Sequence, residues 1–147
     1  MTMTALTSIR HGQTTPTPRA KRSIADLLAP LNQLAQTSPH VVAKPGAFHL
    51  DETTCELPRY VFIGRKAGDE PLRVGLFAAI HGDEPEGAFA LARYLTMLDG
   101  NPELAAGYCL FVYPVCNPTG FEDNTRCSRR NHDLNREFWN NSNAEAA

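Results

Sequence analysis

The sequence predicts an α/β fold with a mixed, mostly parallel sheet flanked by helices. Apolar runs over residues 72–80 and 108–115 are each typical of a buried strand, and residues 84–98 between them have helical periodicity. Because a strand, a helix and a strand in this order form a right-handed parallel crossover, we expect both strands in one sheet. Ligands of such sheets bind beyond the carboxyl ends of the strands, which is where His81 and Asn117 would lie.

The N-terminal segment precedes the predicted domain, which we place at residues 23–139. Residues 1–22 contain four basic side chains and no acidic one, and their Thr and Pro content favours a disordered basic tail over an organellar transit peptide. Ser23 is placed to cap a helix, and Pro30 is expected to kink or end it. Residues 140–147 are expected to be a frayed end. The apolar positions of the helix are Ile24, Leu27, Leu28 and Leu31.

Short strands are expected between this helix and the first apolar run. Residues 37–58 contain prolines and isolated polar residues and predict strands and loops that we place only loosely. Residues 60–63 are β-branched and aromatic, which predicts a strand. A polar connection over residues 66–71 leads on to the strand at 72–80, so we expect these two strands to form an antiparallel pair.

Residues 84–98 form the clearest predicted helix. Asp83 is placed to cap it, with Glu86 three residues further on, and Pro85 is tolerated in the first turn. This arrangement leaves Glu84 free for another role. The apolar face of the helix consists of Ala88, Leu91, Ala92, Leu95 and Leu98.

Composition and charge argue against several function classes. The net charge of -2 and the pI near 6.2 give no overall basic field, so we expect no nucleic-acid partner. No apolar run approaches the roughly 20 residues needed to cross a bilayer, and no secretory signal opens the sequence, so we expect a cytoplasmic protein without membrane insertion. The four cysteines lack close paired spacing, which predicts reduced thiols and no cysteine zinc site.

His81 and Glu84 stand three residues apart where the first apolar run ends and the helix begins. Gly82 allows a sharp turn there, which would fold both side chains to the same side. Neutral imidazole nitrogen and carboxylate oxygen both bind zinc, so the pair could supply two of the three protein ligands of a hydrolytic site. Taken alone, the spacing is better explained by a hydrogen-bonded histidine and a glutamate at a helix N-terminus.

A second motif lies in residues 117–138, a polar segment rich in arginine and asparagine that follows the second apolar run. Such groups are costly at the end of a buried strand unless they meet a ligand or one another. Guanidinium groups match carboxylates bidentately, so an anionic substrate is the expected partner.

The two motifs together resemble the zinc carboxypeptidase family and its branch of succinylglutamate desuccinylases and aspartoacylases. The resemblance covers residues 60–139. The matching residues are H-x-x-E at 81–84, Asn117-Pro118-x-Gly120, Thr125-Arg126 and Asp133-Leu134-Asn135-Arg136-x-Phe138.

The resemblance implies a role for each residue of the site. His81 and Glu84 would bind Zn²⁺, and Asp133 would orient the imidazole of His81. Arg126 would be the catalytic residue that polarises the scissile carbonyl. The residues implied to bind the substrate carboxylate are Asn135 and Arg136.

Part of the family pattern is not matched. Arg129 and Arg130 lie close to Arg126 and are interpreted as a solvated basic loop. The family's third zinc ligand, a histidine, and its general-base glutamate stand far downstream of Asp133, whereas this chain ends at Ala147. We therefore expect an incomplete N-terminal portion of the fold that is inactive alone.

The implied function is a metallocarboxypeptidase that cleaves an amide bond adjacent to a free carboxylate of a peptide. We favour this branch because Arg126 stands seven residues before Asp133, the longer of the two branch spacings. One alternative is an N-acyl-amino-acid deacylase, whose substrate is an N-acyl amino acid. Others are a non-catalytic truncated fragment and an unrelated α/β binding module.

Overall fold

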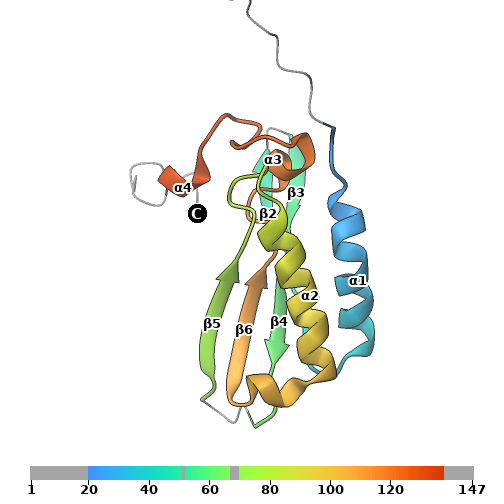
Figure 1. The fold of residues 1–147 in the computed structure, drawn as a ribbon. Helices are drawn as coiled ribbons and strands as arrows, with labels where there is room; N and C mark the ends of the chain where they lie inside the picture. Colours follow the sequence, from blue (N-terminus) through green and yellow to red (C-terminus); the bar gives the residue numbers. More distant parts are fainter. Residues whose placement is uncertain (1–19, 51, 67–69, 138–147) are drawn as a thin grey trace, which may run out of the picture.

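The computed structural model describes residues 20–50, 52–66 and 70–137, and four strands of this part form the central sheet (Figure 1). Their order across the sheet is β1-β4-β6-β5. Their bounds are Val41–Ala43 for β1, Tyr60–Ile63 for β4, Leu72–Phe77 for β5 and Tyr108–Tyr113 for β6. The three strands predicted individually are present, and two of them end earlier than expected. Residues 1–19 of the predicted tail and the predicted end at 140–147 lie outside the described residues.

The strand pairing makes the sheet mixed. β5 and β6 are parallel, whereas β6 pairs antiparallel with β4, and β4 pairs antiparallel with β1. The mixed sheet is confirmed, but parallel pairs are not the majority among these four strands. The predicted pairing of β4 with β5 is wrong, because β6 lies between them. β6 takes this central place with Leu110 and Val112 buried in the core.

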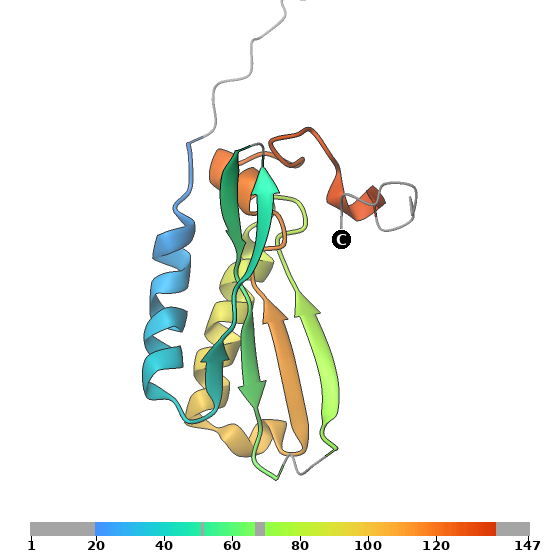
Figure 2. The same ribbon diagram turned by 180° about the vertical axis from the view of Figure 1, so that it is seen from behind.

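Helices α1 (Ile24–Thr37) and α2 (Glu86–Gly100) cover the same face of the sheet, as the two opposite views show (Figure 1, Figure 2). In Figure 1, α2 lies in front of the sheet and β6 lies to the right of β5, so the crossover from β5 through α2 to β6 is right-handed, as predicted. The core between helices and sheet includes Leu27, Leu31, Phe62, Ala88, Leu95, Leu98, Leu110 and Val112.

The first helix begins as predicted but ends later. The hydroxyl oxygen of Ser23 accepts a hydrogen bond of 3.1 Å from the main-chain N–H of Asp26. Pro30 does not end the helix, which continues to Thr37. Leu27 and Leu31 on either side of Pro30 are buried in the core, and this packing outweighs the hydrogen bond that the proline removes.

The second helix starts later than its sequence suggests. Its N-cap is Pro85, and no side chain caps it, so the predicted cap by Asp83 is wrong. The reason is that residues 81–84 close a turn of their own, in which the N–H of Glu84 donates to the carbonyl of His81 at 3.2 Å. The helix can therefore begin only after this turn. The predicted apolar face is confirmed, with Ala88, Ala92, Leu95 and Leu98 buried.

The short helices after β6 and a separate strand pair gather at the end of the sheet to which β5 and β6 point (Figure 1). There the short helices α3 (Pro118–Asp123) and α4 (Leu134–Glu137) follow β6. β2 (Gly46–Leu50) and β3 (Thr53–Leu57) form a separate antiparallel pair, and the 3-10 helix η1 (Pro102–Ala105) follows α2. None of the helices in the described ranges has the length and apolarity to span a membrane. All four cysteines are free thiols, as predicted.

Candidate metal centre

Two loops lie side by side beyond the carboxyl ends of β5 and β6. The N–H of Cys116 donates to the carbonyl of Ala78 at 2.9 Å, and the N–H of Asn117 donates to the carbonyl of Ala79 at 3.0 Å. Ala79 has a φ of 47°, a left-handed conformation that costs an L-residue roughly 1–2 kcal/mol. The two loops thus hold the chain in an unfavourable conformation two residues before His81, as is common at functional sites.

Gly82 fixes the turn that follows. Its N–H donates to the carbonyl of Arg126 at 3.3 Å, so the turn is joined to the loop after α3. A Cβ atom on Gly82 would lie 1.9 Å from the carbonyl carbon of Gly120, which leaves room for hydrogen alone. The turn that contains His81 therefore packs directly on the main chain of α3.

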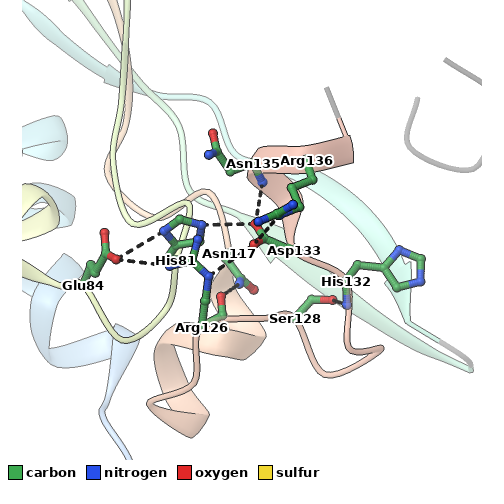
Figure 3. A network of polar contacts seen from close by, with 9 residues as sticks. All are labelled: His81, Glu84, Asn117, Arg126, Ser128, His132, Asp133, Asn135 and Arg136. Atoms are coloured by element: carbon green, nitrogen blue, oxygen red, sulfur yellow. Dashed lines mark hydrogen bonds and ion pairs between the residues drawn. The ribbon is translucent and has the colours of Figure 1, made fainter. Parts of the chain in front are cut away.

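His81 and Glu84 point toward each other across this turn (Figure 3). The distance between His81 Nδ1 and Glu84 Oε1 is 3.3 Å. Two atoms bound at about 2 Å to one tetrahedral ion stand roughly 3.3 Å apart, so the pair has the spacing of two ligands of one zinc ion. The imidazole is largely buried and the carboxylate is mostly exposed, which leaves access from solvent. No group of three or more His, Cys, Asp and Glu side chains in the described ranges is arranged to hold a metal ion.

Asp133 binds the other side of the histidine ring (Figure 3). His81 Nε2 lies 3.1 Å from Asp133 Oδ1, and Arg126 Nε donates to Asp133 Oδ2 at 3.2 Å. Desolvation raises the pKa of Asp133, but hydrogen bonds from His81 and Arg126 outweigh it and hold the pKa below its usual value. An anionic Asp133 accepts the Nε2 proton, which leaves Nδ1 as the nitrogen free to bind a metal.

Arg126 lies between the two carboxylates of the site. Its Nη1 is 3.6 Å from Glu84 Oε1, while its Nε contacts Asp133. About half of the side chain is exposed, so the guanidinium remains accessible to a ligand beside the His81 and Glu84 pair. A cation in this position can stabilise negative charge that develops on a bound oxygen.

Asn135 and Arg136 also meet at Asp133. The main-chain N–H of Asn135 donates to Asp133 Oδ1 at 3.2 Å, and Arg136 Nε lies 3.5 Å from Oδ2. Arg136 is highly exposed, and Asn135 lines a cavity of about 410 Å³ that also borders His81 and Glu84. The structure thus brings all six candidate residues into one cluster at the carboxyl ends of β5 and β6.

Sequence reasoning missed the part that Asn117 takes in this cluster. The side chain is buried, its oxygen accepts from the N–H of Gly120 at 3.0 Å, and its amide donates to the carbonyl of Arg126 at 3.3 Å. It therefore links the start of α3 to the main chain of Arg126. An asparagine before Pro118 is a helix-start signal, and that signal could have identified Asn117 as a cap.

Arg129 and Arg130 are exposed, as expected from the sequence, but Arg129 also pairs with an acidic side chain. Its Nε donates to Asp123 Oδ2 at 2.7 Å, and its Nη2 donates to Asp123 Oδ1 at 3.0 Å. The pKa of Asp123 is lowered first by this hydrogen bonding, against desolvation, and Arg129 has a raised pKa for the same reason. The guanidinium of Arg129 thus pairs with acidic side chains of α3.

The chain is similar to known proteins in sequence and in fold. A family model described as the succinylglutamate desuccinylase/aspartoacylase catalytic domain matches residues 71–146, slightly more than half of the chain. A comparison with curated proteins found no match.

Several solved structures share the fold. A metallo-carboxypeptidase from Burkholderia cenocepacia has a TM-score of 0.67 and 19% identity, over 85% of this chain and 35% of its own. A succinylglutamate desuccinylase/aspartoacylase from Rhodobacter sphaeroides has a TM-score of 0.52 and 23% identity, over 66% of this chain and 30% of its own. The product-bound ectoine utilization protein of Ruegeria pomeroyi has a TM-score of 0.51 and 25% identity, over 68% and 30%. The chain spans about a third of the length of these structures.

Proposed function

Because the chain belongs to the succinylglutamate desuccinylase/aspartoacylase catalytic domain family, we propose that its cluster forms part of the active site of a zinc-dependent hydrolase. The reaction is cleavage of an amide bond adjacent to a free carboxylate. One observation supports this above all others. His81 Nδ1 and Glu84 Oε1 are 3.3 Å apart while Asp133 engages the opposite ring nitrogen, which is the arrangement of a metal-binding histidine with a carboxylate partner.

His81 and Glu84 hold the ion in this proposal. When bound, zinc supplies Lewis acidity toward the scissile carbonyl and toward a water molecule. Asp133 keeps the proton of His81 on Nε2 and so keeps Nδ1 available. Two protein ligands hold zinc less firmly than the three of a hydrolytic site, so we expect weak binding by the described residues.

Arg126 and the α4 residues act on the substrate. The guanidinium of Arg126, beside Glu84, donates hydrogen bonds to the carbonyl oxygen as negative charge develops on it. Arg136 is exposed enough to form a bidentate pair with the substrate carboxylate, and Asn135 borders the adjacent cavity. Recognition of the carboxylate places the neighbouring amide bond near the metal.

Two substrate classes fit this site. A carboxypeptidase acting on a peptide is the first candidate, because Arg126 precedes Asp133 by seven residues. A deacylase acting on an N-acyl amino acid is the second, and the family model that matches residues 71–146 favours it. Both need a carboxylate next to the scissile bond.

Zinc binding by the 147-residue chain tests the proposal. Calorimetric titration of the metal-free chain should show one zinc ion, and H81A and E84A should each abolish that binding. H132A is the matched control, since His132 is half exposed and its imidazole pairs with Glu137. Zinc binding that survives H81A would contradict the proposal.

The zinc-loaded chain is then assayed with a short peptide and with N-succinylglutamate. From a two-ligand site we expect release of neither a C-terminal residue nor succinate. Turnover of one substrate would contradict this expectation of inactivity and would identify the branch.

A further inference from the structure

Arg22, from the segment expected to be a disordered tail, reaches the turn between His81 and Glu84. Its Nη1 donates a hydrogen bond of 2.7 Å to the carbonyl oxygen of Gly82, sixty residues along the chain. The guanidinium also lies over the ring of Phe121, 5.4 Å from the ring centroid. The main-chain N–H of Arg22 donates to the carbonyl of Glu122 at 2.9 Å, so both ends of this residue are held.

The carbonyl that Arg22 binds belongs to the peptide group at the middle of the turn. Gly82 is buried, its N–H is bound to Arg126, and its Cα packs on Gly120. These two contacts come from the loop and helix after β6. Arg22 supplies the third contact, and it comes from the chain before α1, outside the β5-α2-β6 crossover. Gly82 is therefore held at three points, its N–H, its Cα and its carbonyl oxygen, and Arg22 alone among these contacts holds the peptide group between Gly82 and Asp83.

We propose that Arg22 is a positioning residue for the metal-binding turn, which holds the Gly82 carbonyl and thereby the spacing of His81 Nδ1 and Glu84 Oε1. The inference rests on the proposed function, because the spacing matters only if the pair binds metal. A charge-assisted hydrogen bond to a buried carbonyl is among the stronger protein hydrogen bonds. Rotation of the peptide group between Gly82 and Asp83 would move His81 and Glu84, the candidate ligands on either side of it.

Two other roles for Arg22 predict other effects of its loss on zinc affinity. If Arg22 only fastens the N-terminal segment to α3, its loss lowers the melting temperature and leaves zinc affinity unchanged. If its positive charge merely repels the metal, its loss tightens zinc binding. Positioning of the turn alone predicts weaker zinc binding.

The experiment compares the zinc affinities of five forms of the full chain by competition with a chromophoric chelator, well below their melting temperatures. R22M keeps an unbranched apolar stem over Phe121 but removes the donor, while R22K keeps a cation and a donor. R59M is the matched control, since Arg59 Nε also donates to a main-chain carbonyl, that of Lys44, at 2.6 Å. The fourth form is wild type, and H81A gives the reference for loss of the site.

We expect R22M to bind zinc about tenfold more weakly than wild type, R22K to fall between them, and R59M to match wild type. The visible absorption of the cobalt-loaded chain should change in R22M, because the ligand spacing changes. Equal or tighter zinc binding by R22M, with binding lost in H81A, would overturn this inference alone. Wild type and H81A binding zinc alike would overturn the proposed function as well. If R22M does not fold, R22K decides, with weaker binding supporting the inference and unchanged binding overturning it.

Discussion

Gly82 and Gly120 meet through their main chains, at a separation that leaves no space for a side chain on Gly82. A Cβ atom there would lie 1.9 Å from the carbonyl carbon and 2.2 Å from the carbonyl oxygen of Gly120. Both of these Gly120 atoms belong to the main chain, so a side chain on Gly82 could be accommodated only if the turn or α3 moved. The contact joins the turn that contains His81 to the helix that leads to Arg126.

We predict that G82A lowers the free energy of unfolding by at least about 2 kcal/mol, as expected for overpacking against rigid atoms. G100A is the control, because no atom lies within 4 Å of a Cβ on Gly100 and this residue ends α2. There alanine should be neutral or should stabilise by about 0.5–1 kcal/mol. Urea unfolding of both variants measures the difference, and a wild-type midpoint for G82A would contradict the packing described.

Replacement of Asp133 should weaken metal binding. D133N removes the charge that orients His81, and loss of such a partner typically costs about 10- to 100-fold in metal affinity. D123N is the matched control, because Asp123 also pairs with an arginine of the same loop but contacts Arg129 and Lys21 rather than His81. Zinc competition should show a loss for D133N and none for D123N. Equal affinities would exclude a role for Asp133 at the metal.

Replacement of Arg126 should have the opposite effect and raise the affinity for zinc. The guanidinium of Arg126 lies 3.6 Å from Glu84 Oε1. It therefore competes with a metal ion for the Glu84 carboxylate, and its positive charge repels that ion. We predict that R126Q tightens zinc binding by about fivefold, the effect of about 1 kcal/mol of charge interaction. Arg136 pairs with Asp133 rather than with Glu84, so the change in zinc affinity of R136Q should be smaller. Weaker zinc binding by R126Q would show that Arg126 stabilises the ligand pair.

The pair of Arg129 and Asp123 should affect stability only above acidic pH. Arg129 holds the pKa of Asp123 below its usual value by hydrogen bonding. The pair therefore contributes its full stability above the unfolded pKa of about 3.9, and this contribution is lost as pH falls through the lower folded pKa. R129Q should lower stability at neutral pH by no more than about 1 kcal/mol, since the pair is partly exposed.

Thermal unfolding of wild type and R129Q between neutral pH and about pH 2 measures this effect. The difference between them should shrink toward acid. In a D123N background, R129Q should add no pH-dependent loss. A difference that grows toward acid would contradict the assigned pairing.

Local patterns predicted the elements better than their arrangement. Residues 60–63 are found as β4 without change, because β-branched and aromatic residues next to Gly64 specify a short strand locally. The neighbours of a strand depend on distant contacts, and β6 occupies the place beside β4 that the sequence predicts for β5. Pro30 shows the same limit, since tertiary packing holds α1 through it.

The sequence predicts those residues of the candidate site that belong to motifs with the residue spacing of the family. His81, Glu84, Arg126 and Asp133 were identified from two such motifs, and the structure brings them together. Arg22 could not be found this way, because a single arginine in a basic segment has no spacing partner, and its contact lies sixty residues away. Tertiary structure alone reveals that contact.

The parallel pairing of β5 with β6 also determines when the cluster can assemble during folding. Parallel neighbours cannot close as a hairpin, so the whole crossover through α2 must form first. His81 and Asp133, 52 residues apart, come within hydrogen-bond distance only after that closure. Such long-range pairing is slow, because the entropy of the loop is lost before the new contacts compensate for it. We therefore expect the newly synthesised chain to fold before it can acquire a metal ion at this site.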